Sequence, residues 1–175
     1  MALTRAELLE YGGGTQKGYR AENYRASSRG AATATVFLSH SHEDRDLVEP
    51  AANFLASLGV KVYVDWQDPL MPAITSADTA RRIRHMIRVN KRFLLLATER
   101  SLGSRWVPWE LGYADGEKAF VDIAVLPISE ATYRQAPNEY IQVYQRIVEA
   151  STGDWYVFEP DENNSSLSVK DWLLR

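Results

Sequence analysis

From Thr33 onward, short apolar runs alternate with segments whose apolar residues recur at helical spacing. This alternation is typical of a parallel sheet whose strands are joined by crossover helices. The sequence therefore predicts an α/β fold with five parallel strands and helices on both faces of the sheet. The expected strands are residues 36–38, 60–66, 93–97, 123–128 and 155–158.

Signals at helix ends support this arrangement. The helix expected from Leu47 is followed by Gly59, which suits a C-cap. It contains Pro50, which either distorts the first turn or delays the regular helix to about Glu49. Further helices are expected over residues 75–90, 107–118, 140–148 and 169–173.

Residues 1–32 differ in composition from residues 33–175. They contain Gly12-Gly13-Gly14 and scattered basic side chains but few apolar ones, so we expect an N-terminal arm with one short helix, lying on the domain or on a neighbouring molecule. A phosphate-binding loop is disfavoured because Tyr19 stands where the Walker motif requires lysine. The prediction is an arm over residues 1–32 and one domain over residues 33–175.

Composition excludes several classes of protein. The 175 residues include no cysteine, which rules out disulfides, thiolate metal sites and cysteine nucleophiles. A net charge of −3 argues against nucleic-acid binding by bulk charge. The first residues lack the apolar run of a signal peptide, and no stretch has the roughly 18 apolar residues of a membrane helix. We expect a cytoplasmic protein without membrane or nucleic-acid partners.

The predicted topology indicates where a ligand would bind. In open parallel sheets, ligands lie outside the carboxyl ends of the strands, where the strand order reverses. For the flavodoxin-like order 2-1-3-4-5, that point lies between the first and third strands. The residues that leave these strands are 39–42 and 98–110.

Trp106 and Glu110 are the most informative side chains of this region. Four positions apart on a helix that begins near Arg105, they share one face, and Pro108 is tolerated in the first turn. An aromatic plane beside a carboxylate suits a flat cationic ring joined to a sugar. The structural alternative is that Trp106 packs on the sheet while Glu110 caps a helix or pairs with an arginine.

Glu110 has a specific chemical use in this setting. Cleavage of the bond between nicotinamide and ribose passes through an oxocarbenium-like state, as in glycoside hydrolysis. Nicotinamide leaves from a cationic form and needs no general acid. A single carboxylate that holds the ribose and opposes the developing positive charge can therefore suffice.

The segment His40-Ser41-His42, with nearby acidic residues, has several interpretations. It could bind zinc, but the spacing fixes no further ligand, so we expect no metal site. Ser41 and Asp44 more plainly form a helix cap, and His42 offers ring donors to a phosphate or ribose. A Ser-His-Asp hydrolase is disfavoured because the sequence has no GxSxG motif.

Two surface features also have structural and functional interpretations. The basic run from Arg81 to Arg92 is either a solvated helix face or a contact for an assembly or an anionic partner. The loop from Trp66 to Pro72 presents Leu70 and Met71 either for ordinary packing or for a neighbouring subunit.

Taken in order along residues 33–160, these motifs resemble a Toll/interleukin-1 receptor (TIR) domain. Each motif alone is weak, and their order together with the Trp-x-x-x-Glu element makes the set specific. The residues that carry the resemblance are Val36 to Ser41, Glu43, Asp44, Asp46, Val62 to Asp65, Phe93 to Thr98, Ser104 to Trp106, Glu110 and Leu111.

The resemblance implies a flavodoxin-like sheet, NAD+ as substrate rather than cofactor, and a mobile assembly loop after the second strand. It implies Glu110 as the catalytic residue. The family's loop usually contains glycine, whereas Pro69-Leu70-Met71-Pro72 has none, which leaves the loop's conformation and assembly role open. The implied substrate-binding residues are Ser39, His40, His42, Asp65, Trp66, Ser104 and Trp106.

A short TIR protein without a fused domain resembles bacterial anti-phage proteins, some of which cyclise NAD+ into signals for a downstream effector. The predicted function is an NAD+ glycohydrolase or cyclase, active on self-association. The first alternative is a TIR–TIR adaptor without catalysis. The second is a flavodoxin-like domain that binds another nucleotide or transfers a nucleoside.

Overall fold

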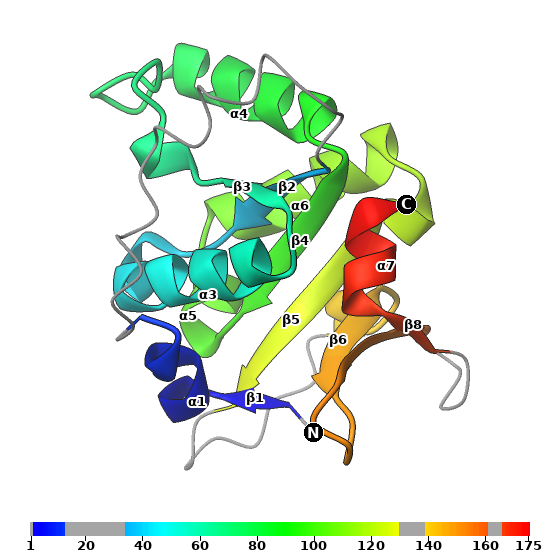
Figure 1. The fold of residues 1–175 in the computed structure, drawn as a ribbon. Helices are drawn as coiled ribbons and strands as arrows, with labels where there is room; N and C mark the ends of the chain where they lie inside the picture. The colour runs from blue at the N-terminus through cyan, green and yellow to red at the C-terminus, as the bar shows by residue number, and fades with distance from the viewer. Residues whose placement is uncertain (1, 13–33, 130–138, 161–165) are drawn as a thin grey trace.

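The computed structural model describes residues 2–12, 34–129, 139–160 and 166–175. Within these ranges, eight strands form one sheet in the order β3-β2-β4-β5-β6-β7-β8, with β1 paired to β5 (Figure 1). The strands are β1 (Leu3–Thr4), β2 (Thr35–Ser39), β3 (Lys61–Tyr63), β4 (Arg92–Ala97), β5 (Ile123–Ser129), β6 (Gln145–Glu149), β7 (Trp155–Phe158) and β8 (Ser166–Ser168).

Helices connect these strands, as the alternating pattern predicts. The α-helices are α1 (Arg5–Glu10), α3 (Arg45–Ser57), α4 (Ala77–Val89), α5 (Glu99–Gly103), α6 (Trp106–Glu117) and α7 (Val169–Leu174). The short 3-10 turns are η2 (His42–Asp44), η3 (Asp65–Gln67), η4 (Phe120–Asp122) and η5 (Glu139–Ile141). Helix α3 begins before Pro50 and keeps it in its interior, so its start is not delayed to Glu49.

The central strands confirm the predicted flavodoxin-like order. Strand β2 pairs in parallel with β3 on one side and with β4 on the other, and β4 pairs in parallel with β5. The strand order therefore reverses beside β2, between the first and third strands of the prediction. The carboxyl end of β2, at Ser39, lies at this switch point.

The far edge of the sheet differs from the prediction. The helix expected over residues 140–148 is wrong: the turn η5 is followed there by β6, which pairs in parallel with β5. The expected strand at 155–158 forms as β7 but runs antiparallel to β6, and β8 runs antiparallel to β7. The sheet is therefore mixed and has more than five strands, because a tight turn returns the chain along the same edge. Gly153 provides a positive φ of 85° in that turn.

Alternation of side chains along each strand separates two cores. On β2, Val36 and Leu38 enter one core with α1, α3 and α7, while Phe37 enters the other with α4 and α6. Figure 1 shows α1, α3 and α7 on the near side of the sheet. In β4 all six residues are buried, as expected for a central strand covered on both faces.

The N-terminal segment is part of the sheet and its core. Leu3 pairs with Ile128 beyond the point where β6 leaves β5, and Leu3 and Leu8 are both buried in the first core. Thr4 and Glu7 form a complete capping box at the start of α1, which is the short helix expected in the arm. The predicted boundary at residue 32 lies outside the described residues.

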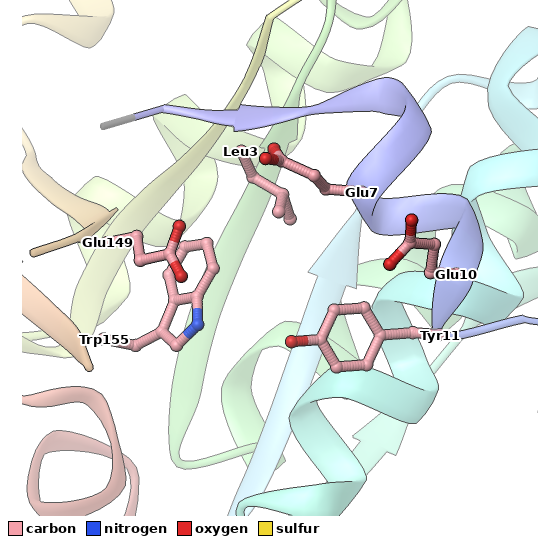
Figure 2. A pocket seen from close by; sticks show the side chains of 6 residues that line it. All are labelled: Leu3, Glu7, Glu10, Tyr11, Glu149 and Trp155. Atoms are coloured by element: carbon pink, nitrogen blue, oxygen red, sulfur yellow. The ribbon is translucent and has the colours of Figure 1, made fainter. Parts of the chain in front are cut away.

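A cavity of about 310 Å³ separates the N-terminal segment from β6 and β7. Figure 2 shows the side chains of Glu7, Glu10 and Tyr11 on one side of this cavity and those of Glu149 and Trp155 on the other. Burial raises the pKa of the Tyr11 hydroxyl, and the charges of the neighbouring carboxylates raise it as well. None of the predicted site residues lines this cavity.

Candidate active site

The carboxyl end of β2 and the first half of α6 meet at the switch point. Ser39, the last residue of β2, donates a hydrogen bond of 2.6 Å from Oγ to Oε2 of Glu110. Both residues are buried, with Glu110 only 5% exposed. The structural alternative for Glu110, a helix cap or a pairing with arginine, is wrong, because Glu110 lies inside α6 and its hydrogen-bond partner among the described residues is the Ser39 hydroxyl.

Burial changes the acidity of Glu110. The pKa of the carboxyl is raised to about 8: burial is the largest cause, the Ser39 hydrogen bond lowers the pKa, and the charge of Asp65 raises it. This acid therefore holds its proton at neutral pH. A cationic group bound beside Glu110 would lower the pKa of this carboxyl. Glu110 would then ionise when such a group binds.

His40 lies next to this pair and has a defined tautomer. Its Nδ1 is 3.0 Å from the carbonyl oxygen of Leu38, which can only accept, so Nδ1 carries a proton. Burial is the largest influence on His40 and lowers the pKa of its imidazole, while Asp65 opposes that change. The neutral ring consequently presents a lone pair at Nε2.

The Nε2 of His40 faces a second acceptor. It lies 3.5 Å from Oδ1 of Asp65, and it has no hydrogen bond to any described residue although its side chain is 3% exposed. Two acceptors at this separation can share a donor placed between them, such as a hydroxyl group of a ligand.

The outer residues of the predicted site are more exposed. Trp66 follows Asp65, donates its backbone N–H to the Asp65 carboxylate at 2.7 Å, and is 42% exposed. The ring of His42 lies 6.3 Å from that of His40 and its residue is exposed. Both stand at the rim of the site, away from the hydrogen bond between Ser39 and Glu110.

Ser104 and Trp106 lie at the start of α6. The Ser104 hydroxyl accepts from the backbone N–H of Trp106 at 3.2 Å, so it caps the helix that carries Glu110. Trp106 is half-buried and packs edge-on against Trp109, with ring centroids 5.3 Å apart. The prediction that Trp106 and Glu110 occupy successive turns of one helix is confirmed.

Sequence reasoning missed the role of Asp44. Its side chain makes no cap hydrogen bond and is instead fully buried, accepting from the hydroxyl of Thr98 at 2.5 Å. Thr98 follows β4 and caps α5, so this bond ties the start of α3 to the start of α5. A signal existed in the sequence, since both residues leave strands that flank the switch point.

The loop after β3 is ordered without glycine. Asp68 accepts hydrogen bonds from the Tyr63 hydroxyl at 2.7 Å, from Nε of Arg82 at 2.7 Å and from the backbone of Leu70 at 2.9 Å. No non-glycine residue in the described ranges has a positive φ. A buried carboxylate therefore shapes the turn that glycine would otherwise allow.

Among the residues that the structure covers, no three His, Cys, Asp or Glu side chains gather to form a metal site. The described helices are all too short or too polar to cross a bilayer.

Two bacterial proteins are similar to this chain. A protein of Bacillus cereus (strain MSX-D12), provisionally named 3' cyclic ADP-D-ribose synthase ThsB', is 34% identical over 120 residues, which make up 66% of this chain and 61% of that protein. A protein of Cytobacillus dafuensis, provisionally named cyclic ADP-D-ribose synthase TIR2, is 30% identical over 82 residues, which make up 45% of this chain and 22% of that protein. The chain spans less than two thirds of the length of either relative.

The family model described as the TIR domain matches residues 36–153, which run from the second residue of β2 to the turn before β7. This range includes Ser39, His40, Asp65 and Glu110, the four side chains that converge at the switch point. The match agrees with the flavodoxin-like order of the central strands. The chain therefore belongs to the TIR domain family.

Proposed function

We propose that this protein cleaves the bond between nicotinamide and ribose in NAD+, with Glu110 as the catalytic residue. The observation that carries the proposal is the buried Ser39–Glu110 pair at the point where the strand order reverses. A buried carboxyl group with a raised pKa, close to a second carboxylate, is typical of catalytic sites. Trp106, one turn earlier on α6, offers an aromatic plane beside it.

The proposed reaction needs one developing positive charge to be stabilised. The bond between ribose C1 and the nicotinamide nitrogen breaks, and its electron pair stays on nitrogen, which leaves as neutral nicotinamide. The ribose becomes an oxocarbenium-like cation. Ionised Glu110 opposes this charge, while Ser39 orients the carboxylate. A hydroxyl nucleophile then bonds to C1 and loses its proton to solvent water.

Asp65 and His40 have the geometry to hold hydroxyl groups in this scheme. The Nε2 lone pair and the Asp65 carboxylate, 3.5 Å apart, can together accept from a ribose hydroxyl. The nucleophile can be water, which gives ADP-ribose, or a hydroxyl of the same substrate, which gives a cyclic product. The names of both bacterial relatives support the cyclic product.

Association of several copies is part of the proposal. The loop between β3 and α4 presents apolar side chains to solvent, with Leu70 69% exposed and Ile74 81% exposed. Trp66 joins them at the rim of the site. We propose that these side chains contact a second copy, that assembly activates the enzyme in the cytoplasm, and that its product signals to a downstream effector in anti-phage defence.

The test is a chromatographic assay of NAD+ turnover with concentrated protein. Glu110→Gln should abolish nicotinamide release and leave the fold intact, because the amide keeps the shape of the side chain and an acceptor for Ser39. Glu117→Gln is the matched control, since it makes the same change on the exposed end of the same helix. The proposal fails if wild-type protein releases no nicotinamide, or if Glu110→Gln releases it equally well.

The exposed apolar loop also favours a second candidate, a TIR–TIR adaptor without catalysis. Under that hypothesis, Glu110→Gln would leave self-association and partner capture unchanged, and wild-type protein would show no NAD+ turnover. Sedimentation and turnover measured on the same samples separate the two functions.

A further inference from the structure

A groove of about 530 Å³ lies between the N-terminal halves of α4 and α6. Helix α4 comes after β3 and its loop, and α6 comes after β4 and the short helix α5, on the side of the carboxyl ends of the strands that also carries Ser39 and Asp65. The groove is lined by Ala77, Ala80, Arg81, Arg84, Arg105, Trp106 and Trp109.

The lining of this groove is cationic. It includes three arginines and no carboxylate. Arg81 forms an exposed ion pair with Asp78, whereas Arg84 is held over two aromatic rings, 5.4 Å from the centroid of Trp109 and 5.2 Å from that of Tyr113. Stacking limits the freedom of the Arg84 guanidinium and leaves its edge available for hydrogen bonds, which suits a phosphate group.

Arg105 adds a second charge at a favourable place. It is the N-cap residue of α6, a helix of 12 residues with no acidic side chain in its first turn. The positive end of the helix dipole and the Arg105 guanidinium therefore act in the same direction, toward an anion at the mouth of the groove.

Trp106 joins the groove to the candidate active site. Its indole lines the groove, and it precedes Glu110 by one turn of α6. A ligand in contact with Trp106 could extend either toward the Glu110 carboxyl or toward the arginines. The volume lies within the range of about 300–1,000 Å³ that is typical of small-molecule sites.

We infer that this groove binds the diphosphate of NAD+, with Arg84 and Arg105 as its main contacts, and that the indoles of Trp106 and Trp109 flank the attached nucleoside. The inference rests on the proposed function, because it assigns the anionic part of the substrate whose ribose would face Glu110. It assigns Arg84 and Arg105 to substrate specificity, since nicotinamide riboside has no diphosphate to engage them.

The experiment compares Arg84→Ala and Arg105→Ala with Arg88→Ala. Arg88 lies one turn after Arg84 on α4 but pairs with Glu117 and Tyr113 outside the groove, so it controls for lost charge. Each groove variant should raise KM for NAD+ about tenfold while kcat changes less than twofold, because a charge-assisted contact made equally in ground and transition states is lost. Arg88→Ala should leave KM unchanged.

Binding is measured separately on the Glu110→Gln protein, which should not turn over substrate. ADP should bind and quench tryptophan fluorescence, and its affinity should fall about tenfold in each groove variant. Inorganic phosphate should bind at least a hundredfold more weakly than ADP. Equal binding of phosphate and ADP would overturn the inference, since the groove would then be a simple anion site.

Failure of the inference and of the proposed function are distinguishable. If wild-type protein releases no nicotinamide, the proposed function fails. If it does, but both groove variants keep the wild-type KM and ADP affinity, only the inference fails. A fall in kcat without a rise in KM, or an equal effect of Arg88→Ala, would also overturn the inference.

Discussion

Ser39 donates a hydrogen bond to Glu110 across 71 positions of sequence, joining the end of β2 to the middle of α6. Because this bond favours the ionised carboxylate, Ser39→Ala should raise the pKa of Glu110 above its already elevated value. We expect kcat/KM for NAD+ to fall about tenfold at pH 7, with partial recovery at pH 9. The measurement is the pH profile of kcat/KM.

Ser41→Ala is the control for that experiment. Its hydroxyl accepts a hydrogen bond from the backbone N–H of Glu43 instead of contacting Glu110. The profile of Ser41→Ala should keep the wild-type midpoint. A uniform loss in Ser39→Ala at every pH would contradict the proposed effect on acidity.

Asp65 should act on Glu110 in the opposite direction. Its charge raises the pKa of the Glu110 carboxyl, so Asp65→Asn should lower that pKa and shift the rising limb of the kcat/KM profile to lower pH. The plateau should also be lower, because an acceptor for substrate hydroxyls is weakened. A midpoint that stays in place or moves upward would show that the charge of Asp65 does not reach Glu110.

Glu110 should make stability depend on pH. Between about pH 4.5, the ordinary value for the unfolded chain, and about pH 8, the folded protein keeps a proton that the unfolded chain loses. The free energy of unfolding therefore falls as pH rises through this window. Glu110→Gln has no such proton, so at pH 8 it should be about 1–3 kcal/mol more stable than wild type.

Thermal unfolding of both proteins from pH 5 to pH 9 checks this expectation. The gap between them should widen with pH. Glu117→Gln, the same change at an exposed position of α6, should show no gain. A constant gap would mean that Glu110 titrates alike in the folded and unfolded states.

Asp68 should be essential for the loop after β3. Its side chain is 4% exposed and accepts three hydrogen bonds, so Asp68→Ala leaves Arg82 and the Tyr63 hydroxyl without this partner. We expect a loss of about 2–4 kcal/mol in denaturant unfolding and faster proteolysis of residues 65–76. Asp78→Ala removes an exposed ion pair with Arg81 and should change neither property.

The N-terminal segment should contribute to the stability of the domain. Leu8 is fully buried and Leu9 is 40% exposed on the same helix. Leu8→Ala should cost about 2–4 kcal/mol, because a cavity opens in the core against α3, and Leu9→Ala should cost little. If both variants lost equally little free energy of unfolding in denaturant, the packing of α1 would not contribute to the stability of the domain.

The sequence predicts the central strands and α6 well because the local signals there agree with the final structure. The run Phe93 to Ala97 is apolar throughout and becomes a strand buried on both faces. Trp106 and Glu110 have the spacing of one helix face, and α6 begins at Trp106. Topology then brings Ser39 to Glu110, since only the strand order places β2 beside β4.

Residues 140–148 show where local pattern fails. Tyr140, Val143, Tyr144 and Ile147 recur at helical spacing, yet Ile147 lies in a strand between β5 and β7. Short apolar runs fit either period, and β-branched residues favour strands once partners exist on both sides. The strand forms because β5 has an edge with which β6 can pair, and residues 140–148 alone do not show that edge.

The site is less predictable at the level of single contacts. The spacing predicts that Asp44 caps a helix. In the structure its carboxylate is buried instead and accepts a hydrogen bond from the hydroxyl of Thr98, 54 positions later. Ser104, predicted to bind substrate, accepts a hydrogen bond from the backbone N–H of Trp106 at the start of α6. The contact between Asp44 and Thr98 depends on which loops converge at the switch point, so no local pattern encodes it.

The pairing of Leu3 and Thr4 with the end of β5 affects the order in which the chain can fold. The Ser129 hydroxyl lies 3.5 Å from the carbonyl oxygen of Leu3, 126 positions away. During synthesis β1 therefore has no partner strand until β5 has left the ribosome. Its two residues form too few bonds to persist alone. The segment made earliest among the described strands must wait for the central sheet and closes it late.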